Sequence, residues 1–268
     1  MQLQFGAEQI EAWAGLSGDR NPIHFDREAA RRMDAADVVV HGMLALLSVK
    51  HLMGRVNQVL PQDWMQFKAL LKAPVLRDSP VALSTRERSD STGFKLHSSG
   101  GDSEHMIGHV RIVEAPVWLS TTPGFLLARE EVAAWLAQFR DDLGRGVDDW
   151  VALDALIFSH FIRNHLGVIF DCLSPQFRQR QRPDRLEDLS DHLVVQTSHQ
   201  ITFCTSLRSL GQLQTDIRCE IDNIHLIESP GKAVGTLDLG VHVSDRHVMT
   251  ITLGLMVKTL STHQGAVQ

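Results

Sequence analysis

Two residues in one short stretch of this chain are of types that move protons between a substrate and water. Asp19 and His24 lie five positions apart in Ser-Gly-Asp-Arg-Asn-Pro-Ile-His, so a single loop carries a carboxylate and an imidazole. Pro22 fixes its own φ and restrains Asn21, because proline cannot continue a helix and restricts the residue before it. We therefore expect a stiff loop that holds an acid/base pair, with the Asn21 amide supporting Asp19 or the loop backbone.

Gly42 has the properties of a donor that stabilises negative charge. It opens an apolar segment, Gly42–Val56, whose apolar residues fall on nearly every face and predict a buried helix. A backbone N–H at a helix start has no partner within the helix and lies at the positive end of the helix dipole. Because glycine has no side chain, a carbonyl oxygen can approach this N–H closely and have its developing charge stabilised.

Together these stretches resemble the MaoC-like, R-specific enoyl hydratase family, whose pattern reads Ser-Gly-Asp-x-Asn-Pro-x-His and then His-Gly-Met-Leu. The resemblance is specific over about the first 60 residues and fades afterwards. It implies that Asp19 and His24 bind the catalytic water, that Gly42 is the oxyanion donor and that Asn21 supports them. It also implies a hydro-lyase that interconverts a (3R)-hydroxyacyl and a trans-2-enoyl thioester on coenzyme A or acyl-carrier protein, without a metal or another cofactor.

Several alternatives stay open at this level. Asn21, together with His41 and Met43 on either side of Gly42, is a candidate substrate-binding residue, although the His41 ring can equally cap the helix or fill the pocket wall. The acid/base loop could be a plain turn with Asp19 as a local cap and His24 at the surface. Other functions compatible with the sequence are a hot-dog acyl thioesterase and a non-catalytic acyl-thioester binding subunit, because hot-dog folds serve several chemistries.

The order of elements predicts the fold. Helical patterns in the first half lie at Ala7–Leu16, at Arg27–Met33 with Asp26 as N-cap, and at Gly42–Val56. Strand patterns follow near Trp64–Leu71, Val81–Arg88, Phe94–Ser98 and His105–Glu114. After a linker at 114–124 the order repeats, with helices at Arg129–Leu143 and Val151–Leu166 and strands near Leu193–Leu207, Leu213–Ile227, Lys232–Ser244 and His247–Leu260.

A buried helix followed by an antiparallel sheet that wraps it is the order of a hot-dog fold. We therefore predict an α+β double hot-dog, in which two antiparallel sheets each wrap a central helix and pack as a pseudo-dimer. Residues 1–115 would form the catalytic unit. Residues 125–262 would form a second unit, which we expect to be degenerate because no Asp-x-Asn-Pro-x-His occurs after residue 120. This second unit would shape the acyl tunnel.

Composition limits the remaining possibilities. A net charge of −6 argues against broad nucleic-acid binding, and 43% hydrophobic with 22% charged residues is typical of a soluble globular protein. Three dispersed cysteines, no signal peptide and no long apolar run predict a cytoplasmic protein away from membranes, and we expect a homodimer of double hot-dogs. His160 and His165 are five positions apart, a poor spacing for a metal. The Arg178–Arg185 segment either meets coenzyme A phosphates or an acidic carrier protein, or is a solvated loop.

Overall fold

The strands of the computed structural model form one antiparallel sheet. The structure describes residues 1–54, 63–101, 103–118, 124–143, 146–175, 177, 192–208 and 215–259. Within these ranges the strands are β1 (Gln2–Leu3), β2 (Trp64–Leu71), β3 (Val81–Glu87), β4 (Ser91–Ser98), β5 (Glu104–Val113), β6 (Phe125–Leu127), β7 (His192–Cys204), β8 (Ile217–Ser229), β9 (Lys232–Val243) and β10 (Arg246–Thr259). They are hydrogen-bonded in the order β1-β3-β4-β5-β2-β7-β10-β9-β8-β6.

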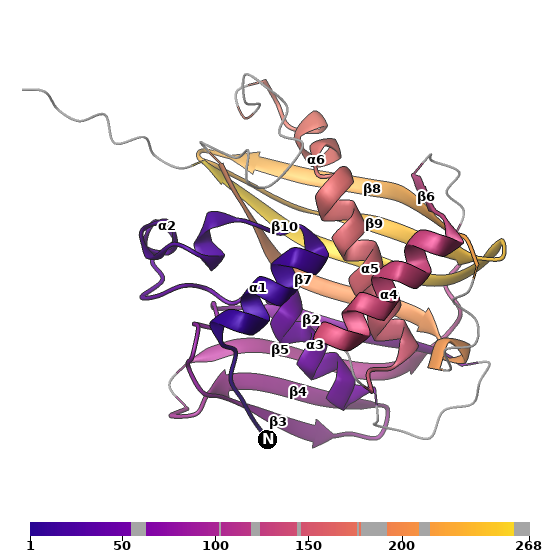
Figure 1. Ribbon diagram of the computed structural model, residues 1–268, viewed down its shortest axis with the longest axis horizontal. Coiled ribbons are helices and arrows are strands. Elements are labelled where there is room, and N and C mark those ends of the chain that lie inside the picture. The colour runs from indigo at the N-terminus through magenta and orange to yellow at the C-terminus, as the bar shows by residue number, and fades with distance from the viewer. Residues whose placement is uncertain are drawn as a thin grey trace, which may run out of the picture.

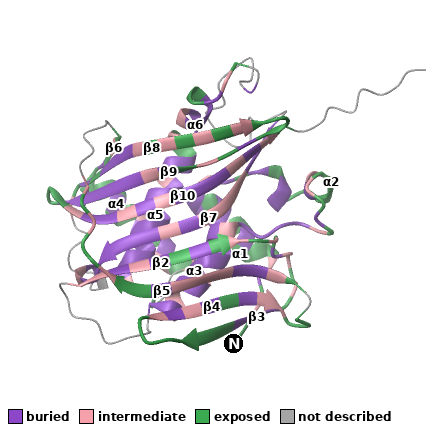
Figure 2. Ribbon diagram, turned by 180° about the vertical axis from the view of Figure 1, so that it is seen from behind, coloured by how far each residue is buried: buried purple, intermediate pink, exposed green. Residues whose placement is uncertain are grey.

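Helices cover one face of this sheet, as Figure 1 shows for α1, α3, α4 and α5. The helices of the described ranges are α1 (Ala7–Ser17), α2 (Arg27–Arg31), α3 (Gly42–Met53), α4 (Arg129–Asp142), α5 (Asp149–Asn164) and α6 (Gly167–Asp171), with 3₁₀ turns at Pro22–His24 and Thr205–Arg208. Seen from the other side, exposed and half-buried residues alternate with buried ones along many strands, because successive side chains point to opposite faces of the sheet (Figure 2).

The strand order is symmetric about the pairing of β2 with β7. On either side of that pair β5 corresponds to β10, β4 to β9, β3 to β8 and β1 to β6, and a long helix precedes the central strand in each half. The predicted α+β double hot-dog is therefore confirmed, with α3 and α5 as the two central helices. The two sheets join into one because residues of β2 pair with residues of β7, from Trp64 opposite Cys204 to Leu70 opposite Ser198. The domain limits 1–115 and 125–262 stay a prediction.

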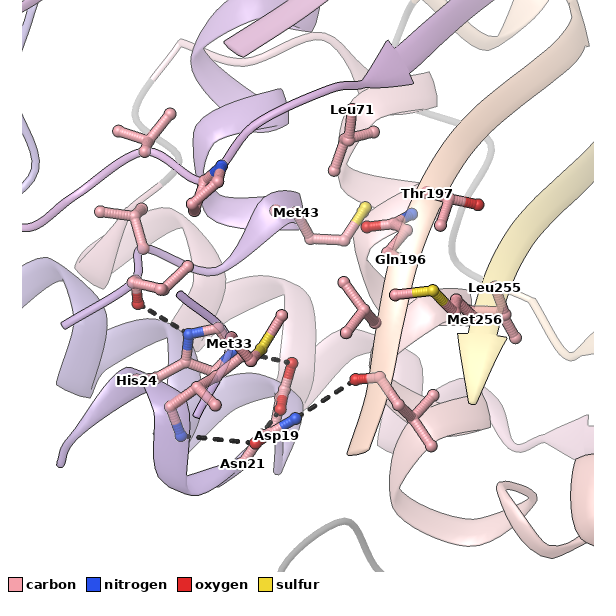
Figure 3. Close-up of a pocket in the computed structure, with 18 of the residues that line it drawn as sticks. Asp19, Asn21, His24, Met33, Met43, Leu71, Gln196, Thr197, Leu255 and Met256 are labelled. Carbon is pink, nitrogen blue, oxygen red and sulfur yellow. Dashed lines mark hydrogen bonds and ion pairs between the residues drawn. The ribbon is translucent and has the colours of Figure 1, made fainter. Parts of the chain in front are cut away.

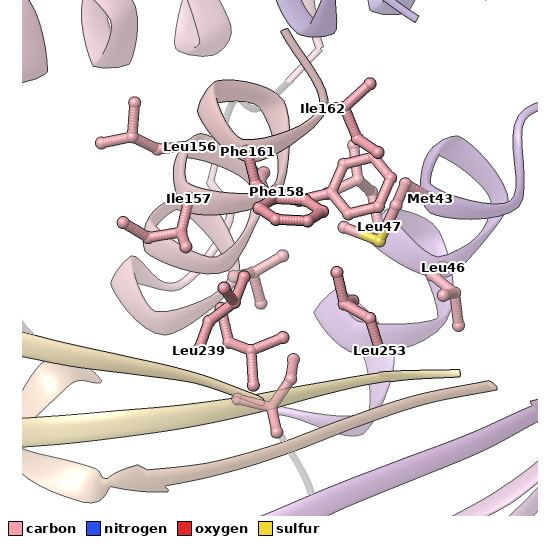
Figure 4. Close-up of a cluster of buried hydrophobic side chains, with 14 of the residues drawn as sticks. Met43, Leu46, Leu47, Leu156, Ile157, Phe158, Phe161, Ile162, Leu239 and Leu253 are labelled. Carbon is pink, nitrogen blue, oxygen red and sulfur yellow. The ribbon is translucent and has the colours of Figure 1, made fainter. Parts of the chain in front are cut away.

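The core lies between the two central helices and the sheet. Buried side chains of α3 such as Leu46 and of α5 such as Phe158 belong to one cluster with Leu239 and Leu253 of the strands (Figure 4). Burying a side chain of this size contributes about 1.5–3 kcal/mol. Both helices are buried on most sides, as predicted for Gly42–Val56, because each is enclosed by the sheet and by neighbouring helices.

The predicted element bounds differ from the observed ones where local geometry intervenes. The helix at Arg27 is capped by Asp26 as predicted, but it ends at Arg31, three residues before Asp34 takes a left-handed conformation with φ 61°. The strand predicted as Leu193–Leu207 ends earlier, because a 3₁₀ turn begins at Thr205. Short elements such as β1, β6 and α6 were not predicted, since so few residues carry no readable period.

Some predictions fall on residues outside the described ranges. These include the Arg178–Arg185 segment, residues 119–123 of the linker and residues 55–56 at the end of the predicted Gly42–Val56 helix. In the described ranges, no helix is long and apolar enough to cross a membrane.

Candidate active site

The loop that carries Asp19 and His24 begins where α1 ends. Gly18 terminates the helix in the left-handed conformation with φ 73°, which glycine adopts without strain. The Ser17 hydroxyl oxygen then accepts a hydrogen bond from the Asp19 N–H at 3.1 Å. Asp19 Oδ1 accepts one from the Asn21 N–H at 3.3 Å, so the first half of the loop is closed by its own side chains. The 3₁₀ turn at Pro22–His24 then brings His24 back towards Asp19.

Asp19 and His24 form a buried acid/base pair. His24 Nε2 lies 3.9 Å from Asp19 Oδ2, and the two residues are only 7% and 9% exposed. His24 Nδ1 lies 2.7 Å from the Val39 carbonyl oxygen, which can only accept, so Nδ1 donates. In the neutral ring Nε2 is therefore the free base and faces the carboxylate. The 3.9 Å separation is too long for a direct hydrogen bond, and a water molecule or a substrate hydroxyl could interact with both groups.

Burial brings the proton affinities of these two groups together. Desolvation raises the pKa of Asp19, against the opposing effects of His24 and of the hydrogen bond from Asn21. Desolvation lowers the pKa of His24, against the opposing effects of Asp19 and of the hydrogen bond to Val39. A carboxyl with a raised pKa and an imidazole with a lowered pKa can exchange a single proton at little cost.

His41 supports this pair from behind. Its ring stacks on the His24 ring with centroids 3.7 Å apart and planes inclined by 27°, and its Nε2–H donates to the Asp19 carbonyl oxygen at 2.9 Å. Burial, with His24 as a second cause, holds the pKa of His41 well below its usual range, so the ring is neutral. Its side chain makes no capping bond to α3. The substrate contact of His41 stays a prediction. Its stacking on His24 and its hydrogen bond to the Asp19 backbone restrict the positions of both residues.

These three side chains do not suit a metal ion, although one ligand atom of each lies within 4.8 Å of the others. An imidazole binds a metal along the plane of its ring, and the two stacked rings cannot aim their lone pairs at one ion. One nitrogen of each ring is also engaged by a backbone carbonyl.

The acid/base pair opens into a cavity of about 330 Å³ between the two halves of the molecule (Figure 3). Of the predicted site residues, Asp19, Asn21, His24, Gly42 and Met43 all line this cavity. The remaining wall is mostly apolar and comes from both halves, including Met33, Val39, Met106, Phe158, Ile162 and Leu255. This lining suits a flexible apolar chain attached to a polar group.

Gly42 is the first residue of α3, as predicted, and its lack of a side chain keeps part of the cavity open. A Cβ atom at this position would lie 2.7 Å from Leu71 Cδ2 and 3.2 Å from Gln196 Oε1. The Gly42 N–H belongs to the first turn, whose N–H groups have no partner within the helix. The position therefore suits an acceptor that approaches α3 along its axis.

The second half of the chain holds the loop that carries Asp19 and His24 in place. Asn21 Nδ2 donates to the Val194 carbonyl oxygen at 3.3 Å, which ties the loop to β7. On α5, the Arg163 guanidinium donates to the carbonyl oxygens of Gly15 and Leu16 at the end of α1. The loop is therefore fixed from both sides, and the roles predicted for Asn21, in support of the loop and in substrate binding, stay predictions.

A second polar cluster was missed from the sequence. Lys50 of α3 forms an ion pair with Asp154 of α5, Asp154 Oδ1 lies 2.8 Å from His199 Nε2, and His199 Nδ1 lies 2.8 Å from Gln196 Nε2. Lys50, Asp154 and His199 are fully buried. A signal was present, because a lysine and an aspartate inside two helices predicted to be buried must find partners.

Comparison with known proteins agrees with the motif. Residues 2–99 match the family model described as the MaoC like domain. The mitochondrial 3-hydroxyacyl-[acyl-carrier-protein] dehydratase of Arabidopsis thaliana is 50% identical over 40 residues, which are 15% of this chain. The match spans 24% of that relative's length, so it bears on a segment and not on the whole protein.

Solved structures are similar at a lower level. A structure described as a MaoC-like dehydratase has a TM-score of 0.46 at 12% identity, covering 97% of this chain and 96% of the other. HtdX of Mycobacterium tuberculosis has a TM-score of 0.42 at 11% identity, covering 95% and 98%. The dehydratase domain of the CurJ module of curacin polyketide synthase has a TM-score of 0.46 at 13% identity, covering 88% and 89%. Likeness at these TM-scores adds nothing to the assignment of an activity.

Proposed function

We propose that this chain, whose residues 2–99 form a MaoC-like domain, is a dehydratase of (3R)-hydroxyacyl thioesters that also hydrates the trans-2-enoyl product. The observation that carries the proposal is the buried pair Asp19 and His24, 3.9 Å apart, at the wall of a cavity that Gly42 also lines. The apolar lining would take the acyl chain, and the carrier would be coenzyme A or acyl-carrier protein.

In the dehydration direction, His24 Nε2 removes the proton from C2 of the hydroxyacyl thioester. The electron pair moves onto the thioester oxygen, where the Gly42 N–H stabilises the enolate. The enolate then collapses to a double bond between C2 and C3, and the bond from C3 to the hydroxyl oxygen breaks. Asp19 gives its proton to the departing hydroxyl, which leaves as water. The proton gained by His24 equals the proton lost by Asp19.

Hydration is the same sequence in reverse, and both directions need one proton on the pair. Dehydration starts with neutral His24 and protonated Asp19, and hydration starts with protonated His24 and ionised Asp19. The raised pKa of Asp19 and the lowered pKa of His24, both caused mainly by burial, support this scheme because they reduce the free-energy difference between the two states.

Hydration of crotonyl-coenzyme A, followed by the loss of enoyl absorbance, tests these roles. Asp19→Asn and His24→Ala should each lower kcat by at least about 100-fold. Asp26→Asn is a matched control, because Asp26 is exposed and asparagine can also cap α2, so this variant should keep the rate of the wild type. An Asp19→Asn enzyme with near wild-type turnover would show that the carboxylate has no part in proton transfer.

We also infer a reducing compartment, the cytoplasm, for this protein. Its three cysteines are dispersed along the chain, with Cys204 and Cys219 buried and Cys172 exposed, which is compatible with such a compartment. The homodimer of double hot-dogs and the role of the Arg178–Arg185 segment stay predictions, which light scattering and substitution of the arginines would check.

A further inference from the structure

A chain of hydrogen-bonded side chains runs from α3 through the core to the cavity wall. It begins with the ion pair between Lys50 and Asp154. Asp154 Oδ1 lies 2.8 Å from His199 Nε2, and His199 Nδ1 lies 2.8 Å from Gln196 Nε2. The first three residues are fully buried, whereas Gln196 is half-buried and faces the cavity (Figure 3). Burying an ion pair without need is costly, so a chain that ends at the candidate site calls for a functional explanation.

Only one arrangement of hydrogens satisfies the whole chain. Lysine can only donate and the Asp154 carboxylate can only accept, so His199 Nε2 carries the hydrogen that Asp154 Oδ1 accepts. Gln196 Nε2, which can only donate, lies 2.8 Å from His199 Nδ1, so Nδ1 accepts and the ring is neutral. Burial agrees with this, because together with Lys50 it lowers the pKa of His199 against the opposing effect of Asp154. Gln196 Oε1 is left as an acceptor that faces the cavity.

A β-bulge makes this contact possible. Gln196 and His199 are three positions apart, and in a regular strand they would point to opposite faces of the sheet. The register between β7 and β10 skips Thr197, and this extra residue turns Gln196 to the same face as His199. Gly254 lies opposite the bulge, where a Cβ atom would come within 2.1 Å of Ser198 Oγ. The strand is therefore shaped locally to place Gln196 at the cavity.

The position of Gln196 Oε1 restricts what it can bind. A Cβ atom added to Gly42 would lie 3.2 Å from Gln196 Oε1, so this oxygen is close to Gly42. The proposed mechanism places the thioester carbonyl at the Gly42 N–H, and Gln196 Oε1 is therefore near that carbonyl. A hydroxyacyl thioester brings two kinds of donor to this region. One is the 3-hydroxyl, which belongs to Asp19 and His24 in the proposed mechanism. The other is the cysteamine amide N–H, two carbons beyond the thioester sulfur in both coenzyme A and carrier-protein substrates.

We propose that Gln196 Oε1 accepts a hydrogen bond from the cysteamine amide N–H of the substrate, and that the Lys50–Asp154–His199 chain fixes the amide for this purpose. Gln196 is then a substrate-binding residue supplied by the second half of the molecule, and Lys50, Asp154 and His199 are positioning residues. The inference rests on the proposed function, since the thioester is placed at Gly42.

A pair of substrates tests the contact. Crotonyl-N-acetylcysteamine carries the amide N–H, and the S-(2-acetoxyethyl) thioester of crotonic acid has an ester oxygen in its place. The wild type should prefer the amide substrate by about 10-fold in kcat/KM, mostly through KM, the size expected of one hydrogen bond with a buried polar group. Gln196→Leu, which keeps neither the acceptor nor the contact with His199, should hydrate both substrates with equal kcat/KM.

Controls separate binding from structure. Thr197→Val, at the neighbouring cavity-lining position, should keep the preference. His199→Leu should lose the preference, because the Gln196 amide is then no longer fixed, whereas a purely structural role would slow both substrates equally and leave their ratio unchanged. A wild type without preference, or a Gln196→Leu variant that keeps it, would overturn the inference.

Failure of the proposed function would look different, because the wild type would then hydrate neither substrate. Calorimetric titration with butyryl-coenzyme A, which has neither a double bond to hydrate nor a 3-hydroxyl to eliminate, decides the inference in that case. Gln196→Leu should bind this thioester about 10-fold more weakly than the wild type. Equal affinities would overturn the inference.

Discussion

Replacing Lys50 by methionine should destabilise the protein through electrostatics alone. Methionine is nearly as long as lysine, and the surroundings accept it, because Lys50 Nζ already lies 3.7 Å from Met43 Sδ and 5.8 Å from the centre of the Phe67 ring. Among the residues that the structure describes, the substitution leaves the fully buried carboxylate of Asp154 with His199 as its remaining partner. Removing one partner of a buried ion pair typically costs about 3–5 kcal/mol.

We expect the lower end of that range, about 3 kcal/mol, because His199 still donates to Asp154 and can gain a proton. For a chain of this size the loss corresponds to a fall in Tm of roughly 6–12 °C. Urea denaturation followed by tryptophan fluorescence would measure the free energy of unfolding. Lys68→Met on β2 is the matched control, since Lys68 is exposed and should change the free energy by less than about 0.5 kcal/mol.

The double variant Lys50→Met, Asp154→Asn completes the cycle. It removes both charges of the buried ion pair, and the asparagine oxygen can still accept from His199, so its stability should return to within about 1 kcal/mol of the wild type. A Lys50→Met variant as stable as the wild type, or a double variant that sums the two single losses, would refute the reasoning.

Two further predictions concern the site itself. Gly42→Val should lower kcat/KM by at least about 100-fold, with KM raised and kcat lowered in steady-state assays. The reason is that even a Cβ atom at this position would lie 2.7 Å from Leu71 Cδ2 and would block the approach of a carbonyl. Unchanged kinetics would show that Gly42 is not part of the site. Burial raises the folded-state pKa of Asp19 above its ordinary value of 3.8, so the contribution of this side chain to stability is complete below pH 3.8 and is lost as the pH rises through the folded-state pKa. Asp19→Asn should therefore gain stability over the wild type between acid and neutral pH in urea titrations, and an advantage that shrinks with rising pH would contradict the raised pKa.

The long elements and the motif were predictable from the sequence because each carries a local signal. Apolar residues on most faces marked Gly42–Met53 as a central helix, and alternation with turn residues marked strands such as Trp64–Leu71. The Asp-x-Asn-Pro-x-His pattern held the information for the loop, since its hydrogen bonds join residues close in the chain. Short elements and the exact ends of helices depend on tertiary contacts and were missed.

The positioning groups were not predictable for a physical reason. Gln196 and His199 have the wrong spacing for one face of a regular strand, and only the bulge at Thr197 brings them together. The resemblance places the segments of His24 and Gly42 at one site, but it does not specify the stacking of the His41 ring on the His24 ring. Contacts of this kind follow from the assembled fold, whereas a motif records only neighbours along the chain.

The most direct test of the proposed function is the identity of the product formed from crotonyl-coenzyme A in D₂O. The proposed mechanism predicts (3R)-hydroxybutyryl-coenzyme A with one deuterium at C2, because the proton delivered by His24 comes from solvent, and no such product with Asp19→Asn. Release of free coenzyme A would indicate a thioesterase, and recovery of unchanged, undeuterated crotonyl-coenzyme A would indicate a binding subunit; either result would contradict the proposed chemistry.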